Sequence, residues 1–198
     1  MRPLLTICVS IFATSTAGAA LLTFDNPSDF PALLDGVTIS YGLYDGLTSD
    51  VAASGSVGHW ASGYGDLTNV AYGNNQLATT HAEIRLQAQP GELVRLESFD
   101  LGAWVSDRDD ISVAVFDENF NAVVDYGSVD LPYRDDQSEL TRTSFDTLAV
   151  GDDLRIRWEW PWVVAIDNVS FNSATIAEPA LAPLAGGLLG LLSLRRRR

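Results

Sequence analysis

Lysine is absent from this chain of 198 residues, and histidine and cysteine are scarce. The histidines are His59 and His81, and the single cysteine is Cys8. The sequence also lacks the Gly-x-Ser-x-Gly, His-Glu-x-x-His and phosphate-binding glycine patterns that accompany common catalytic sites. Paired carboxylates of a glycosidase are compatible with the many acidic residues, but no spacing places two of them across a cleft. We therefore expect a protein that is not an enzyme.

Positive charge is scarce as well. Arginine supplies all 12 basic residues against 26 acidic ones, which gives a formal net charge of −14. Binding to nucleic acid or to an anionic membrane surface requires a surplus of cations at the interface. Nucleic acid is therefore not an expected partner, whereas cations and neutral or basic polymers are. An acidic surface also keeps an exported protein soluble without binding anything, and this explanation stays open.

Segments with a helical hydrophobic period over three turns are missing between residues 20 and 176. Short apolar or alternating runs separated by turn residues occur instead, and these are typical of strands. We expect strands over residues 21–24, 37–41, 83–87, 93–104, 111–116, 122–126, 145–150, 154–160 and 163–171, with a bulge near Glu97-Ser98. Segment 42–75 is rich in Gly, Ser, Asp and Asn and is expected to be mostly loop, with a short strand at 67–71. This pattern predicts an all-β fold, and we assign residues 20–176 to a jelly-roll β-sandwich.

The longest hydrophobic run lies at the C-terminus. Residues 180–194 carry no charge and are followed by Arg195, Arg196, Arg197 and Arg198. As a helix this run is about 22 Å long, short of the ~30 Å hydrocarbon core, but one further turn and snorkelling arginines narrow the gap. Its leucines cover every face, so no polar stripe is left to face water. We expect a short transmembrane helix in the inner membrane, with its arginines on the cytoplasmic side.

Ala177, Glu178 and Pro179 directly precede this run. The order of a Glu-Pro motif, a brief apolar helix and an arginine cluster resembles a PEP-CTERM sorting signal, with Ala177 where that family has proline. The resemblance implies that residues 177–198 are recognised by an exosortase-type processing enzyme and are removed near Glu178-Pro179. It also implies delivery to the cell envelope, cell surface or extracellular matrix of a bacterium with an outer membrane. It says nothing about what the body of the protein binds.

Residues 1–19 have the three parts of a secretory signal peptide. Met1-Arg2 is positively charged, residues 4–13 are apolar, and Ala17-Gly18-Ala19 supplies the small residues of a cleavage site. Cys8 lies within the apolar part and is expected to be removed with it. We therefore expect an exported protein without disulfides.

The body contains two short motifs at its ends, Leu22-Thr23-Phe24-Asp25 and the segment 164–171. Asp167 interrupts an apolar strand, where an ionised carboxylate costs several kcal/mol unless it is compensated. The two motifs resemble those of galactose-binding-like jelly rolls, which are common among carbohydrate-binding modules. The resemblance implies that Asp25 and Asp167 bind a structural Ca²⁺ ion, which prefers oxygen ligands. The alternatives are that Asp167 caps a bulge or pairs with an arginine.

Aromatic residues are the remaining candidates for binding. In a strand over 154–160, alternation places Trp158 and Trp160 in the core and Arg155, Arg157 and Glu159 on the opposite face. Other aromatics lie in expected loops, where exposed rings could stack on a pyranose ring. The candidates for ligand binding are Trp60, Tyr64, Tyr133 and Trp162, and ordinary packing is the alternative for each of them.

Together these observations predict an exported, non-catalytic protein of the envelope or extracellular matrix whose body binds polysaccharide and holds a structural calcium ion. A structural surface protein without a specific ligand is the alternative. A polysaccharide hydrolase is a third hypothesis.

Overall fold

The computed structural model describes residues 18–26, 30–133 and 141–175. Nearly all of the expected signal peptide and the whole of the expected sorting signal, residues 177–198, lie outside these ranges. Within them the chain forms strands and no helix. No helix of the described residues is long and apolar enough to cross a membrane.

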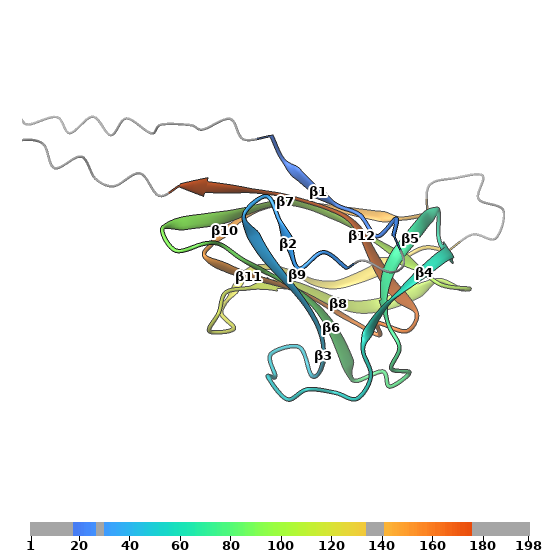
Figure 1. The fold of residues 1–198 in the computed structure, drawn as a ribbon. Helices are drawn as coiled ribbons and strands as arrows, with labels where there is room; N and C mark the ends of the chain where they lie inside the picture. The colour runs from blue at the N-terminus through green and yellow to red at the C-terminus, as the bar shows by residue number, and fades with distance from the viewer. Residues whose placement is uncertain (1–17, 27–29, 134–140, 176–198) are drawn as a thin grey trace, which may run out of the picture. The chain divides into compact units, whose positions relative to one another are not determined.

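Twelve strands are present in the described residues, and they form two sheets that face each other (Figure 1). In chain order they are β1 (Ala20–Leu22), β2 (Leu33–Leu34), β3 (Val37–Asp45), β4 (Val57–Tyr64), β5 (Leu67–Gly73), β6 (Thr80–Gln87), β7 (Glu92–Ala103), β8 (Arg108–Phe116), β9 (Ala122–Leu131), β10 (Thr143–Gly151), β11 (Asp153–Glu159) and β12 (Val164–Thr175). Sheet A has the order β10-β7-β12-β5-β4, with β1 also paired to β12. Sheet B has the order β2-β3-β6-β11-β8-β9. The expected all-β jelly-roll sandwich is confirmed.

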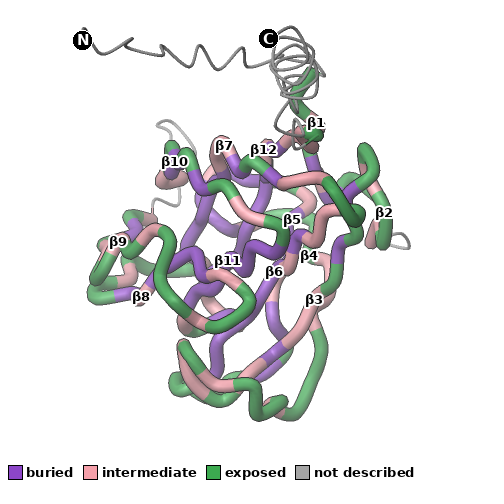
Figure 2. Tube along the Cα trace, turned by 90° about the vertical axis from the view of Figure 1, so that its left-hand side faces the viewer, coloured by how far each residue is buried: buried purple, intermediate pink, exposed green. Residues whose placement is uncertain are grey.

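The main core lies between the sheets and is built by strand alternation. On β11, Leu154, Ile156 and Trp158 face this core, as the sequence pattern predicts. On β12, Val164 and Ile166 do the same from sheet A. Figure 2 shows that the buried part of the chain runs through the middle of both sheets. Burial of these apolar residues is the main contribution that holds the two sheets together.

The register of β7 with both of its neighbours shifts around Glu97 and Ser98, which confirms the predicted bulge. Segment 42–75 is not mostly loop, because it contains the end of β3 and the whole β4–β5 hairpin. The expected short strand at 67–71 is present as β5, which buries residues on both faces, Ala71 against the main core and Val70 against a second cluster. Strand β4 was not expected, because most of its side chains are exposed or half-buried.

The outer face of sheet B carries charged residues that are buried. Arg157 is fully buried and Glu83 is 2% exposed, and Arg157 Nε donates to Glu83 Oε2 at 2.6 Å. Arg157 Nη1 also donates to the carbonyl oxygens of Leu47 at 3.0 Å and Ser49 at 2.8 Å. The loop after β3 is therefore held over the sheet by a guanidinium group.

Aromatic rings complete this enclosure. The guanidinium carbon of Arg157 lies 4.2 Å from the ring centre of Tyr44 and 4.6 Å from that of Phe120. Arg155 lies over Phe120 as well and pairs with Asp50 at 3.0 Å. Arg155 and Arg157 lie opposite the core face, as alternation predicts, but neighbouring segments cover them.

The two ends of the described chain lie at the same end of sheet A (Figure 1). Ala20 of β1 pairs with Phe171 of β12, and β12 continues to Thr175, which pairs with Glu92. The start of β12, where Val164 pairs with Ala103, lies at the opposite end of the sheet.

Candidate functional site

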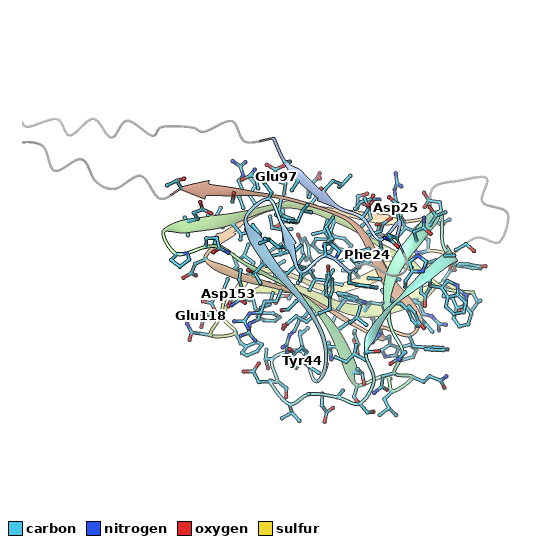
Figure 3. The ribbon with its side chains drawn as sticks, in the orientation of Figure 1. Phe24, Asp25, Tyr44, Glu97, Glu118 and Asp153 are labelled. Carbon is cyan, nitrogen blue, oxygen red and sulfur yellow. The ribbon has the colours of Figure 1, made fainter. Side chains whose placement is uncertain are left out.

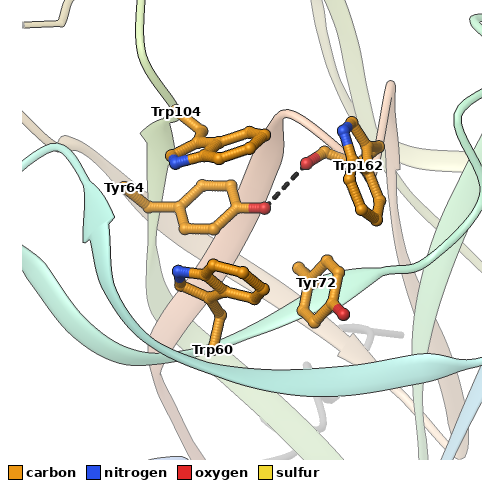
Figure 4. A pocket seen from close by; sticks show the side chains of 5 residues that line it. All are labelled: Trp60, Tyr64, Tyr72, Trp104 and Trp162. Carbon is orange, nitrogen blue, oxygen red and sulfur yellow. Dashed lines mark hydrogen bonds between the residues drawn. The ribbon is translucent and has the colours of Figure 1, made fainter.

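Five aromatic side chains gather at the end of sheet A where β12 begins (Figure 4). The hairpin of β4 and β5 supplies Trp60, Tyr64 and Tyr72. Trp104 directly follows β7, and Trp162 lies in the turn between β11 and β12. We call these five residues the aromatic cluster.

The hairpin reaches this place because its tip folds over the outer face of sheet A. Tyr64 forms an isolated bridge with Trp104, which lies two residues after Gly102 of β7. A Cβ atom on Gly102 would lie 2.4 Å from the carbonyl oxygen of Tyr64, so only glycine permits this approach. The floor under the rings is a small hydrophobic cluster on the outer face that includes Leu67, Val70 and Ala165.

The rings pack closely against one another. The ring centres of Tyr64 and Trp104 are 6.2 Å apart with an interplanar angle of 28°. Trp60 lies 6.0 Å from Trp104 and 5.7 Å from Tyr72. The space left between the five rings is about 10 Å³, roughly enough for one water molecule. A ligand would therefore lie on the cluster and would not enter it.

Tyr64 and Trp60 differ in their exposure to solvent. Tyr64 is 2% exposed, and its hydroxyl donates to the carbonyl oxygen of Trp162 at 2.7 Å (Figure 4). Burial, followed by the nearby hydroxyl of Tyr72, raises the pKa of Tyr64 above its ordinary value, so the phenol stays a neutral donor. Trp60 is 39% exposed and presents indole surface to solvent. Tyr64 supports the cluster, and Trp60 is its accessible member.

Three of the four expected ligand-binding residues are thus brought together, namely Trp60, Tyr64 and Trp162. Tyr133 is not part of the cluster, because it follows β9, packs at the edge of the main core and donates its backbone N–H to Asp107 at 2.6 Å. Trp104 was not among the candidates. It directly follows β7, and nothing in the local sequence shows that a distant hairpin folds over it.

The expectation that Trp160 belongs to the core is wrong. Strand β11 ends at Glu159, and Trp160 has a φ of 53°, which takes its side chain out of the alternation. It is 36% exposed and packs on the guanidinium of Arg108 at 5.7 Å. Trp158 is fully buried as predicted, and its Nε1 donates to the carbonyl oxygen of Val164 at 3.0 Å.

A buried carboxylate lies next to the aromatic cluster on β12. Asp167 is two residues beyond Ala165, on the same outer face, and pairs in register with Asp100 of β7. It is 6% exposed, and its Oδ1 has no hydrogen-bond partner among the described residues. Burial, with the charges of Asp25 and Asp100 as smaller contributions, raises the pKa of Asp167 to about 6. The register shifts directly after Asp167, so this carboxylate does lie at a bulge.

Asp25 lies on the outer side of the sandwich, whereas the preceding residue Phe24 is buried in the main core (Figure 3). Its carboxylate accepts hydrogen bonds from Thr23 Oγ1 at 2.9 Å and from Asn69 Nδ2 at 3.1 Å. In the ranges that the structure describes, no group of three or more His, Cys, Asp or Glu residues is arranged to hold a metal ion. A cation at Asp25 and Asp167 would therefore need amide, carbonyl or water oxygens as its further ligands.

The arginine whose charge affects Asp167 is Arg142, and it is engaged with other carboxylates. Arg142 Nε lies 3.5 Å from Asp100 Oδ2, and Arg142 Nη1 lies 3.5 Å from Asp66 Oδ2. Its charge lowers the pKa of Asp167 only as the smallest of the contributions. The idea that Asp167 forms an ion pair with an arginine therefore finds no close contact in the described residues.

No protein-family model and no curated protein matches this chain. Solved structures match at low similarity. One is the GH26-CBM35 β-(1,4)-mannanase of Podospora anserina, with 14% identity and a TM-score of 0.39, covering 74% of this chain and 29% of the mannanase. A CBM4 structure matches with 12% identity and a TM-score of 0.38, covering 77% of this chain and 97% of that one.

The CBM22-1 xylan-binding domain of Paenibacillus barcinonensis Xyn10C is a third, with 12% identity and a TM-score of 0.34, covering 73% of this chain and 100% of the domain. The chain thus has carbohydrate-binding modules among its structural neighbours and spans less than a third of the mannanase.

Proposed function

We propose that this domain binds polysaccharide without catalysis, by stacking a pyranose ring on the exposed indole of Trp60. The observation that carries the proposal is the aromatic cluster, in which an exposed tryptophan is held by contacts with Tyr72 and Trp104. Exposed aromatic surface suits the apolar C–H face of a sugar ring. Because its neighbours already restrict the Trp60 side chain, binding costs little further conformational entropy.

The charge of the chain narrows the ligand class. With a formal net charge of −14, the protein repels polyanions over distances of about a Debye length. Neutral polysaccharides and those with basic sugars are the expected ligands, in preference to polymers of uronic acids. Because the rings leave room for only about one water molecule, the ligand is expected to lie across the surface.

Replacing Trp60 by alanine is expected to weaken polysaccharide binding at least tenfold, which corresponds to about 1.4 kcal/mol. The measurement is isothermal titration or affinity electrophoresis with a panel of neutral, basic and acidic polysaccharides. Trp160→Ala is the matched control, because Trp160 is similarly exposed but lies outside the aromatic cluster and packs on Arg108. This control is expected to bind like the wild type.

Equal losses in both variants would contradict a specific role for Trp60. If the folded wild-type protein binds no member of the panel, the proposal fails and a structural role in the matrix without a specific ligand takes its place. Products that appear with the wild type and vanish when single carboxylates become amides would instead reveal a hydrolase.

We further propose that Asp25 and Asp167 hold a structural calcium ion beside the aromatic cluster. The buried Oδ1 of Asp167, which has no partner in the described part of the chain, supports this site, as do the hard oxygen donors of both residues. A bound divalent cation would compensate the charge of the buried Asp167 carboxylate.

Export and sorting are also part of the proposal. They rest on the sequence of residues 1–19 and 177–198, with Glu178-Pro179 and the terminal arginines as the signal for an exosortase-type enzyme. In the host, the matured protein is expected to end near Glu178, which mass spectrometry of its C-terminal peptide can establish. An intact Arg198 in the exported protein would contradict the sorting signal.

A further inference from the structure

We infer that Asp66, at the tip of the β4–β5 hairpin, is a positioning residue for the ligand-binding surface of Trp60. This inference rests on the proposed function of the aromatic cluster. Asp66 itself is not among the residues that line the cluster, and its side chain is 15% exposed.

The hairpin is weakly tied to sheet A by its strands. Among the described residues, β4 forms a ladder with β5 alone, and its last residue Tyr64 adds the isolated bridge to Trp104. β5 pairs with β12 through the single register pair of Ala71 and Ile166. A longer ladder would fix the hairpin along its whole length, as it does for β7 and β12. Contacts at the tip must therefore supply much of the attachment.

Asp66 makes several of these tip contacts at once. Its Oδ1 accepts the backbone N–H groups of Thr141 at 2.9 Å and Arg142 at 2.8 Å. Its Oδ2 lies 3.5 Å from Arg142 Nη1, and the same arginine reaches Asp100 of β7. Next to Asp66, Gly65 has a φ of 61°, and a Cβ atom there would lie 2.6 Å from Thr141 Oγ1. One carboxylate thus fastens the hairpin tip to the segment before β10 and, through Arg142, to β7.

The position of the hairpin tip in turn determines where the rings of the aromatic cluster lie. Tyr64 lies two residues before Asp66, stacks on Trp104 and is hydrogen-bonded to the backbone of Trp162. Trp104 also contacts Trp60, so a shift of the tip changes the support on which the Trp60 indole rests. Small displacements of a preorganised contact are expected to reduce binding without unfolding the domain.

The test compares two substitutions at Asp66. Asp66→Asn keeps an oxygen that accepts both backbone N–H groups, whereas Asp66→Ala removes it. We expect Asp66→Ala to weaken polysaccharide binding about tenfold and Asp66→Asn to restore most of the affinity. Asp50→Ala is the control, because it breaks an aspartate–arginine contact on sheet B, and it is expected to bind like the wild type.

Binding is measured at a temperature where thermal melting shows every variant to be folded. Lower melting temperature with unchanged affinity in Asp66→Ala would overturn the inference, since Asp66 would then serve stability alone. Equal losses in Asp66→Ala and Asp50→Ala would overturn it as well.

A second readout does not depend on a ligand. In the full-length protein, Asp66→Ala is expected to change the near-ultraviolet circular dichroism of the stacked rings and to speed exchange of the Trp60 and Trp104 indole protons, whereas Asp50→Ala is not. If the wild type binds no polysaccharide but these signals change, the proposed function fails and the positioning of the rings by Asp66 stands. Unchanged signals in Asp66→Ala would overturn the inference.

Discussion

Replacing Arg157 by methionine is expected to lower the free energy of unfolding by about 3–5 kcal/mol. The substitution leaves Glu83, which is 2% exposed, as a buried carboxylate whose remaining cationic neighbour is Arg155 at 4.0 Å. It also takes a hydrogen-bond donor from the carbonyl oxygens of Leu47 and Ser49. Unsatisfied buried polar groups each cost about 1–3 kcal/mol, so the loss is larger than the net contribution of a single ion pair.

Chemical denaturation with urea measures this change. The matched control is Arg95→Met, because Arg95 is 49% exposed and lies 3.9 Å from Glu97, and its loss is expected to cost less than about 1 kcal/mol. The double variant Glu83→Gln/Arg157→Met is expected to recover part of the loss, since it no longer buries an unpaired charge. A loss of less than 1 kcal/mol in Arg157→Met would show that water reaches Glu83 and that the loop does not seal this face.

Replacing Asp167 by asparagine is expected to stabilise the calcium-free protein at pH 7 by about 2–3 kcal/mol, as expected for a carboxylate whose pKa is raised from 3.8 to about 6. The amide removes the buried charge, and its NH₂ group can donate to the neighbouring carboxylates of Asp25 or Asp100. Calcium is expected to affect the stability of the two proteins differently. The wild type gains stability from the ion, whereas Asp167→Asn gains little.

The same carboxylate predicts how the stability of the calcium-free wild type depends on pH. Because the folded state raises the pKa of Asp167 from 3.8 to about 6, the folded protein holds this proton more tightly than the unfolded chain. The resulting stabilisation is fully present below pH 3.8 and is lost as the pH rises through about 6. Burial and the charges of Asp25 and Asp100 favour the protonated form, whereas the backbone hydrogen bond from Asn168 and the charge of Arg142 oppose it.

Both predictions, the effect of Asp167→Asn and the pH dependence of stability, can be tested by thermal melting across this pH range. The melting is measured once with chelator and once with excess calcium. Asp109→Asn, at an exposed carboxylate near the start of β8, is the control and is expected to leave the calcium effect unchanged. An equal calcium shift in the wild type and in Asp167→Asn would exclude Asp167 as a ligand. A calcium-free wild type that is as stable as Asp167→Asn at pH 7 would show that its charge is compensated within the protein.

The sequence predicts the regular strands well, because their apolar residues alternate against a single core. Leu154, Ile156 and Trp158 are examples, and the irregularity at Glu97 follows from a change in the same alternation. Strand β5 was expected as the short strand 67–71, but its partner β4 was missed because most of its side chains are exposed or half-buried. Local pattern identifies a strand that has a buried face and fails for a strand that lacks one.

The candidate site, too, could be predicted from the sequence only in part. Residue type alone identified Trp60 and Trp162 as candidates, because exposed aromatics suit sugar binding. Their assembly with Trp104 depends on a close approach between Gly102 and Tyr64, which are far apart in the sequence. Sequence pattern likewise placed Arg157 opposite the core and could not show that the loop after β3 encloses it.

The placement of the two chain ends has a consequence for orientation. Both described ends leave sheet A at one end, and β12 runs about 36 Å from Thr175 back to Val164, next to the aromatic cluster. The aromatic cluster therefore lies at the end of sheet A opposite to both described chain ends. Many such molecules fixed side by side would present their indole rings as a layer at a common height, so weak single contacts with a long polymer would add up by avidity.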